Sequence, residues 1–146
     1  MRLADYIGWI EPVKKSLIVS IIILGIAIMM GAYWAYETLN FGGYWNWDPV
    51  ENAVYVPWLV LVASFHSIVL TQKNRNNYKL SLILSILCFL LILYSTFLTR
   101  SGILGDSSVH SFTDLGLSGQ LLLYLFSFIF ISTYYLIKRW KTIPTS

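Results

Sequence analysis

The sequence predicts an all-α integral membrane protein with four transmembrane helices in a single domain. Its 146 residues are 57% hydrophobic and only 12% charged, against about 45–50% and about 25% in average soluble proteins. Four long apolar stretches contain no Asp, Glu, Lys or Arg, and each approaches the roughly 20 residues that a helix needs to cross a bilayer. The stretches lack the alternation of barrel strands, which favours helices, and the composition excludes a soluble or disordered chain.

The four predicted spans are residues 17–36, 53–71, 80–99 and 119–137. The first begins late and leads into bulky aromatic residues without a small-residue cleavage site, which disfavours a cleaved signal peptide. The second follows Asp48-Pro49-Val50-Glu51, where Asp at the N-cap, Pro at the first helical position and Glu at the third predict a capping box. The connection 71–79 is polar and basic, as expected of a plain connector.

The positions of the charged residues predict the orientation of the spans. Nine of the ten Lys and Arg residues lie before the first span, between the second and third, or after the fourth. Arg100 is the exception, and it shares its side of the membrane with five of the seven acidic residues. Basic residues concentrate on the cytoplasmic side, so both termini are predicted inside, and residues 37–58 and 100–118 are predicted to face outward.

Residues 34–58 are unusually aromatic, with the sequence WAYETLNFGGYWNWDPVENAVYVPW. Trp and Tyr gather at membrane interfaces in any case, which accounts for two or three of the rings. The alternative is a platform for a large, flat, apolar ligand with one polar edge, such as a tetrapyrrole or a quinone. The composition alone leaves both interpretations open.

Two blocks of this sequence resemble a known family. The run GGYWNWDPVENAVYVPW is similar to the tryptophan-rich WWD signature of the haem-handling proteins of cytochrome c biogenesis. Its DPVEN…PW part most resembles the CcmF-type cytochrome c haem lyases, followed by the CcsA type. The similarity continues through SFHS in the second span and resumes in STFLTRSGILGDSSVHSFTDLG, so that it covers about residues 34–116.

The resemblance implies a function in the bacterial cytoplasmic (inner) membrane, with the active face toward the periplasm. The chain would be a subunit or fragment of a holocytochrome c synthase that presents haem for thioether attachment to the CxxCH motif of apocytochrome c. The platform would bind haem as substrate through its aromatic and acidic side chains: Tyr44, Trp45, Trp47, Asp48 and Trp58. No Ser, Cys or carboxylate is needed as a nucleophile.

The only two histidines are assigned to two different haems by the same resemblance. His66 is expected deep in the second span and would ligate the iron of a transmembrane haem b, whereas His110 would ligate the iron of the external haem. The residues alone leave an alternative interpretation open for each position. His66 could be a structural histidine bonded to a neighbouring helix, and His110 could be a solvated loop histidine. Arg100 is either an interfacial anchor or a partner of a haem propionate.

His66 and His110 cannot share one iron, because one is expected near the bilayer centre and the other outside. Each haem therefore lacks its second axial ligand in this sequence, which predicts a fragment or a split subunit that works with the missing lyase segments or with other cytochrome c biogenesis membrane proteins.

Two other classes of function remain open: a haem carrier or exporter without attachment activity, and a non-catalytic membrane subunit. The single Cys88 excludes an internal disulfide and a Cys-based zinc site. No nucleic-acid partner is expected, because the basic residues are distributed according to topology and do not form a groove.

Overall fold

The computed structural model describes residues 3–39, 42–73, 77–105, 107–108 and 116–143, with side chains from Gly8 onward. These ranges contain four long helices and a short 3-10 turn, and no strand: α1 (Leu3–Leu39), α2 (Pro49–Lys73), α3 (Tyr78–Arg100), α4 (Ser118–Arg139) and η2 (Trp140–Thr142). The predicted all-α class with four long helices is confirmed, and each predicted span lies inside one helix. All four helices are long and apolar enough to cross a membrane, judged by length and composition.

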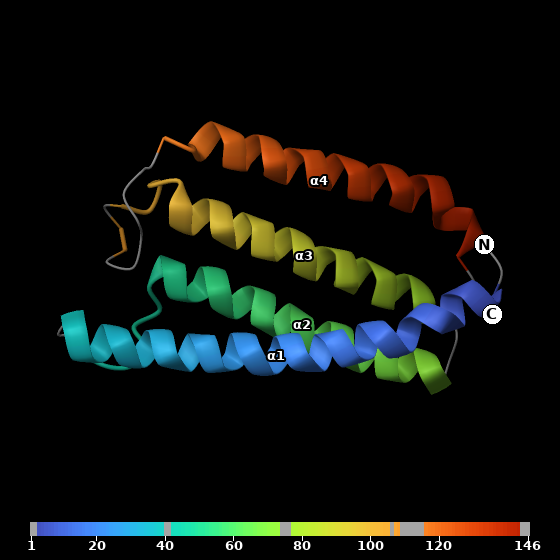
Figure 1. Cartoon of the computed structure of the whole chain (residues 1–146), viewed down its shortest axis with the longest axis horizontal. Coiled ribbons are helices and arrows are strands. Elements are labelled where there is room, and N and C mark those ends of the chain that lie inside the picture. The colour runs from blue at the N-terminus through green and yellow to red at the C-terminus, as the bar shows by residue number, and fades with distance from the viewer. Residues whose placement is uncertain (1–2, 40–41, 74–76, 106, 109–115, 144–146) are drawn as a thin grey trace.

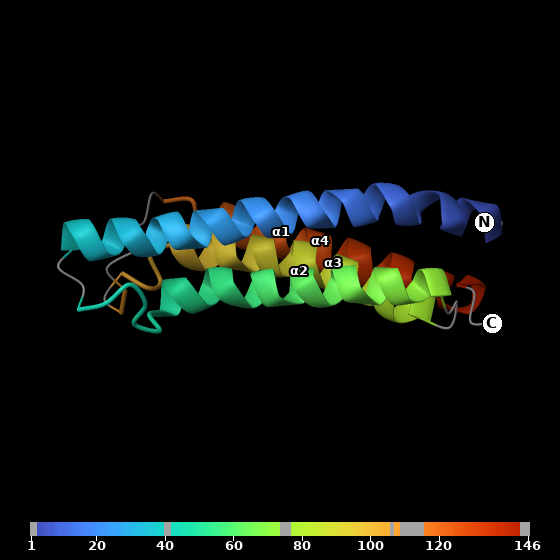
Figure 2. The same cartoon turned by 90° about the horizontal axis from the view of Figure 1, so that it is seen from below.

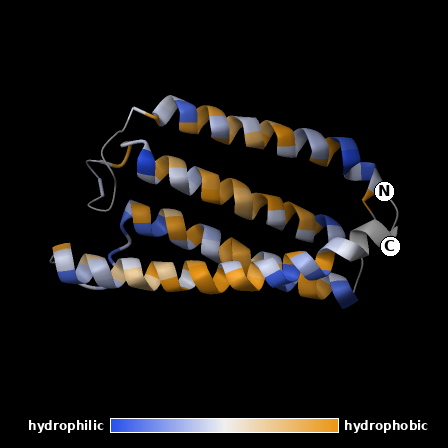
Figure 3. Cartoon of the chain, viewed as in Figure 1, coloured by the Kyte–Doolittle hydropathy of each residue, from blue (hydrophilic) through white to orange (hydrophobic). Residues whose placement is uncertain are grey.

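The helices alternate in direction, and neighbours in the sequence are neighbours in space (Figures 1 and 2). Among the described elements, backbones pack closely only between consecutive ones, and the contact of α2 with α3 is the most extensive. The apolar residues occupy the middle of the helices and the polar residues their ends (Figure 3). We call the end of the helix bundle where α2 begins and α3 ends the aromatic end. The opposite end, where both chain termini lie, is called the basic end (Figure 1).

Hydroxyl groups hold α2 against α3 inside the apolar interface. The Ser67 hydroxyl lies 2.8 Å from that of Ser81, and the Thr71 hydroxyl lies 2.6 Å from the same atom. One turn further along, the hydroxyls of Ser64 and Ser85 lie 3.1 Å apart. Small residues allow the two backbones to approach, and their hydroxyls satisfy each other where water is absent.

The indole of Trp58 joins α2 to α1 near the middle of both helices. Its Nε1–H donates to the backbone carbonyl oxygen of Ile21 at 3.0 Å. The residue one turn further along α1 is Gly25, where an added Cβ would stand 3.1 Å from Nε1. The missing side chain at position 25 therefore gives the indole its access to the carbonyl.

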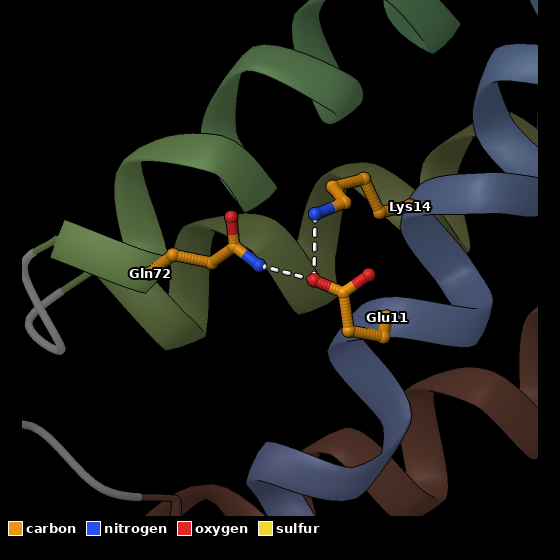
Figure 4. A network of polar contacts seen from close by, with 3 residues as sticks. All are labelled: Glu11, Lys14 and Gln72. Atoms are coloured by element: carbon orange, nitrogen blue, oxygen red, sulfur yellow. Dashed lines mark hydrogen bonds and ion pairs between the residues drawn. The ribbon is translucent and has the colours of Figure 1, made fainter.

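A polar network fastens α1 to α2 at the basic end. Glu11 Oε1 accepts a hydrogen bond from Lys14 Nζ at 2.6 Å and another from Gln72 Nε2 at 2.7 Å (Figure 4). Because Gln72 is close to the C-terminus of α2 and Trp58 is near its middle, these contacts set the register of the two antiparallel helices. The first turns of α1 extend past α2 at this end.

Candidate functional site

The start of α2 is built as the predicted capping box. Asp48 Oδ1 accepts the Val50 N–H at 2.8 Å, and Glu51 Oε2 accepts the Asp48 N–H at 3.0 Å. The same Glu51 oxygen also accepts the Asn46 N–H at 3.0 Å. This arrangement satisfies backbone donors that a helix N-terminus leaves free and fixes the chain that precedes it. The capping box is confirmed.

The Asp48 carboxylate also fastens a distant part of the chain. The Ser108 hydroxyl donates to Asp48 Oδ1 at 2.6 Å, and both side chains are buried, at 9% and 7% exposure. Sixty positions separate the two residues in the sequence. Ser108 belongs to the segment after α3 and lies two positions before His110. The aromatic segment and the segment after α3 are therefore joined at one buried point.

Four aromatic rings form a connected group beside this junction, which we call the ring cluster: Trp45, Trp47, Tyr55 and Trp58. Tyr55 lies in its centre, with ring centroids 5.6 Å from Trp45, 6.2 Å from Trp47 and 6.0 Å from Trp58. The first two contacts are edge-to-face and the third is stacked, which are the geometries that aromatic pairs prefer. Trp45 and Trp47 are themselves 5.8 Å apart at 90°.

Trp47 is the exposed member of the ring cluster, with 65% of its surface accessible. Its backbone has φ = 56°, the left-handed conformation that a bulky residue rarely adopts. The Asn52 amide donates to its carbonyl oxygen at 3.0 Å and helps to hold this conformation. Such a backbone persists only where its surroundings impose it, and it is more frequent at functional sites than elsewhere.

Tyr44 lies outside the ring cluster. Its ring stacks on Tyr36 at a centroid distance of 4.3 Å and an angle of 26°, and both rings are exposed. The tyrosine thus connects the aromatic segment to the last turn of α1. The five residues predicted for the platform are therefore divided among three places: the ring cluster, the Tyr36–Tyr44 stack and the buried cap.

A cavity of about 200 Å³ lies between α1 and α2 below the ring cluster. Its walls are mainly aliphatic, with Trp45 and Glu51 among the residues that line it. Glu51 is only 6% exposed, and its Oε1 makes no hydrogen bond within the part of the chain that the structure describes. One acceptor of a buried carboxyl group therefore makes no hydrogen bond to the described residues.

His66 lies on an exposed face of α2 and far from the ring cluster. Along the helix axis it is about 25 Å from Pro49 and about 10 Å from Lys73. It therefore lies in the half of α2 that is nearer the basic end. Its Nδ1 lies 2.8 Å from the carbonyl oxygen of Val62 and must carry the proton to donate there. The lone pair of a neutral ring is then on Nε2, the atom that a metal would use.

The alternative of a structural histidine bonded to a neighbouring helix receives no support from the described residues. The hydroxyls of nearby Ser64 and Ser67 are bonded to serines of α3, and the imidazole contacts its own helix, with its ring centroid 5.7 Å from that of Phe65. Within the described ranges, His66 therefore has no polar partner on a neighbouring helix.

Arg100 and His110 complete the set of predicted residues. Arg100 is the last residue of α3 and is exposed at the aromatic end, as expected for either of its two interpretations. His110 lies outside the described residues. Within the described residues, no group of three or more His, Cys, Asp and Glu side chains could hold a metal ion.

Sequence reasoning assigned no role to Tyr55 or Ser108 at this end of the molecule, and it assigned Glu51 only as a cap. Tyr55 has a signal, because it precedes Trp58 by three positions and such residues share a helix face. The second carboxylate oxygen of Glu51, which has no partner among the described residues, lies in a cavity that α1 helps to line, and that depends on the packing of the two helices. Ser108 has no local signal, since its contact with Asp48 arises only when the helices pack.

Comparisons with known proteins place these residues in context. The sequence pattern of the cytochrome c assembly protein family matches residues 8–104. The biogenesis protein CycK of Bradyrhizobium diazoefficiens is 46% identical over 124 residues, which cover 84% of this chain and 18% of that protein. Ccl1 of Rhodobacter capsulatus is 39% identical over 121 residues, which cover 83% of this chain and 18% of that protein. CcmF of Escherichia coli is 44% identical over 102 residues, which cover 70% of this chain and 16% of that protein.

The lengths of these relatives differ greatly from that of this chain. It spans less than a fifth of each of the three curated relatives it matches. The residues of this chain that match the family pattern contain α2, α3 and most of α1, and they include the ring cluster and His66. No solved structure matches the chain.

Proposed function

Because the chain belongs to the cytochrome c assembly protein family, we propose that it is the haem-presenting part of a cytochrome c haem lyase. Its relatives are named as cytochrome c-type biogenesis proteins of bacteria, which supports a role in cytochrome c maturation and a location in the bacterial inner membrane. The observation that carries the proposal is the ring cluster, fixed by the buried contacts of Asp48 and Glu51.

Haem as substrate would lie on the exposed side of the ring cluster. The cavity beneath it is about 200 Å³, smaller than the roughly 300–1,000 Å³ of ordinary ligand pockets, so the macrocycle does not fit inside. Trp47 offers a largely exposed indole on a backbone in the left-handed conformation. Flat aromatic surfaces of this kind suit the face and edge of a tetrapyrrole, and Arg100 at the same end would pair with a propionate.

The chemistry assigned to this surface is addition of a thiol to a vinyl group. Each S–H of a CxxCH motif adds across one vinyl double bond, with sulfur bonding to one carbon and the proton going to the other, so no oxidant is consumed. No nucleophile from the chain is required, and the protein contributes by holding the two reactants together. His110 would occupy one axial position of the iron, and the histidine of the substrate motif would take the other.

His66 would hold a second, permanent haem b. Its Nε2 is the nitrogen left with the lone pair, on a face of α2 that no other described helix covers. A haem there would supply one-electron chemistry and keep the external iron reduced. A further residue to hold this haem would come from another transmembrane segment, and the greater length of the relatives supports a protein or complex with more such segments than this chain.

The haem b assignment is tested by the absorption spectrum of the purified protein. We expect b-type bands that disappear in His66→Ala and return when imidazole is added to that variant. Recovery by imidazole distinguishes a lost ligand from a misfolded protein. Unchanged b-type bands in His66→Ala would remove the assignment.

The external ligand is tested by cytochrome c maturation in cells. His110→Ala should abolish maturation and imidazole should restore part of it, because a free imidazole can fill the vacant axial position. A fully active His110→Ala protein would exclude His110 as an iron ligand and leave the rest of the proposal intact.

A further inference from the structure

The basic end of the bundle contains a second candidate site, independent of the proposed function. A hollow of about 670 Å³ lies where α4 ends and η2 begins, lined by Leu136, Ile137, Lys138, Trp140 and Lys141. We call it the basic hollow. We propose that the basic hollow binds the headgroup of an anionic phospholipid, with the lipid chains along the apolar surface of α4.

The chain that forms the basic hollow is held in place by specific contacts. The Thr142 hydroxyl donates to the Arg139 carbonyl oxygen at 2.8 Å, which closes the turn after α4. Ile143 follows directly and is buried in the core cluster together with Ile10 of α1. The turn is thus fastened at both of its ends, and the side chains between them project from an ordered backbone.

Among the described residues, the charged side chains that line the basic hollow are lysines. Lys79 Nζ lies 4.6 Å from the centre of the Trp140 ring, a cation–π distance. Lys138 Nζ contacts the hydroxyl of Tyr134 at 3.4 Å. Within the described residues the one ion pair, between Lys14 and Glu11, belongs to the α1–α2 contact. A phosphodiester would supply an anion to these lysines, which make no ion pair with the described residues.

The apolar part of the surface favours a lipid over a soluble anion. Ile137 and Trp140 are exposed large side chains among the residues that line the hollow, and Leu125 is the one residue of α4 that is buried within the described structure. Basic pockets beside transmembrane helices on the cytoplasmic side are suited to anionic headgroups. The amine of a zwitterionic headgroup would be repelled by the same cations, so the hollow should discriminate between lipids of equal chain length.

The test is native mass spectrometry of the full chain released from detergent containing equal amounts of phosphatidylglycerol and phosphatidylcholine with identical chains. The wild type should retain phosphatidylglycerol preferentially. Each removed charge should lower this retention about fivefold, so Lys138→Gln combined with Lys141→Gln should lower it about 25-fold. Replacing both lysines by arginine should preserve it.

The matched control is Lys15→Gln combined with Lys73→Gln, which removes two exposed charges from the same end but none from the basic hollow. We expect it to stay within twofold of the wild type. An equal loss in both double variants would overturn the proposal, because attraction would then be diffuse. Equal retention of the two lipids would overturn it as well. Full competition by glycerophosphoglycerol, which lacks the chains, would reassign the hollow to soluble phosphodiesters.

Discussion

The contact between Ser108 and Asp48 gives the sharpest prediction about the aromatic end. Ser108→Ala removes a 2.6 Å hydrogen bond to a buried carboxylate and keeps the rest of the side chain. Hydrogen bonds to charged groups contribute about 2 kcal/mol. In a chain of this size 1 kcal/mol corresponds to roughly 2–4 °C, so the melting temperature should fall by roughly 4–8 °C.

The assay is thermal unfolding of the purified chain in detergent, with Ser107→Ala as the control. Ser107 is exposed, and its hydroxyl bonds the Leu104 carbonyl oxygen at 3.3 Å, so its loss should shift the melting temperature by less than about 2 °C. Asp48→Asn keeps an acceptor at the N-cap but removes the negative charge, so in a double-mutant cycle Ser108→Ala should cost less in the Asp48→Asn background than in the wild type. Equal effects of the two serine variants, or strict additivity in the cycle, would refute the reasoning.

Three further predictions concern the helices. Gly25→Ala should move the NMR resonance of the Trp58 indole N–H, because the new Cβ stands 3.1 Å from Nε1. Gly31→Ala has open space around its new Cβ and should leave this resonance in place. A resonance that moves in neither variant would contradict the contact. Ser81→Ala removes the partner of two hydroxyls in the α2–α3 interface and should cost about 1–3 kcal/mol in unfolding free energy; a neutral variant would show that the network contributes nothing. A reporter inserted after Asn77 should give a cytoplasmic signal, and an extracytoplasmic one would reverse the predicted orientation.

The helices were predictable because their signals are local. An apolar run without charge can be stable only in lipid or in a core, so the four spans follow directly from composition. The capping box was predictable for the same reason, since Asp48 and Glu51 act within four positions of each other. Residues before Leu17 were not predicted as helical, because charges end the apolar run there. The helix continues through them in the structure, with Glu11 paired to Lys14 one turn away.

The candidate site was predictable only in part. The rings around residues 44–58 are dense enough to be noticed in the sequence, but their separation into the ring cluster and the Tyr36–Tyr44 stack depends on where α1 ends. The junction of Asp48 with Ser108 depends on the packing of α2 and α3, across sixty positions. No local pattern encodes a contact of that kind.

His66 illustrates a different restriction on sequence reasoning. Its position within an apolar run indicated a functional group, but the run does not reveal which ring nitrogen is free. The backbone does so, because the Val62 carbonyl oxygen one turn earlier can only accept a hydrogen bond and Nδ1 must donate it. The helix thus orients the imidazole with Nε2 away from its own backbone.

The most direct test of the proposed function is the covalent haem content of an apocytochrome with a CxxCH motif, matured in cells that express this chain. Trp47→Ala should abolish covalent haem while the proposed b-type absorption of the purified chain remains, because the variant alters the exposed ring at the aromatic end and leaves His66 intact. Trp34→Ala, which removes an exposed indole of α1 outside the ring cluster, should retain both signals. Undiminished covalent haem in Trp47→Ala would contradict the account and favour a protein that carries haem without attaching it.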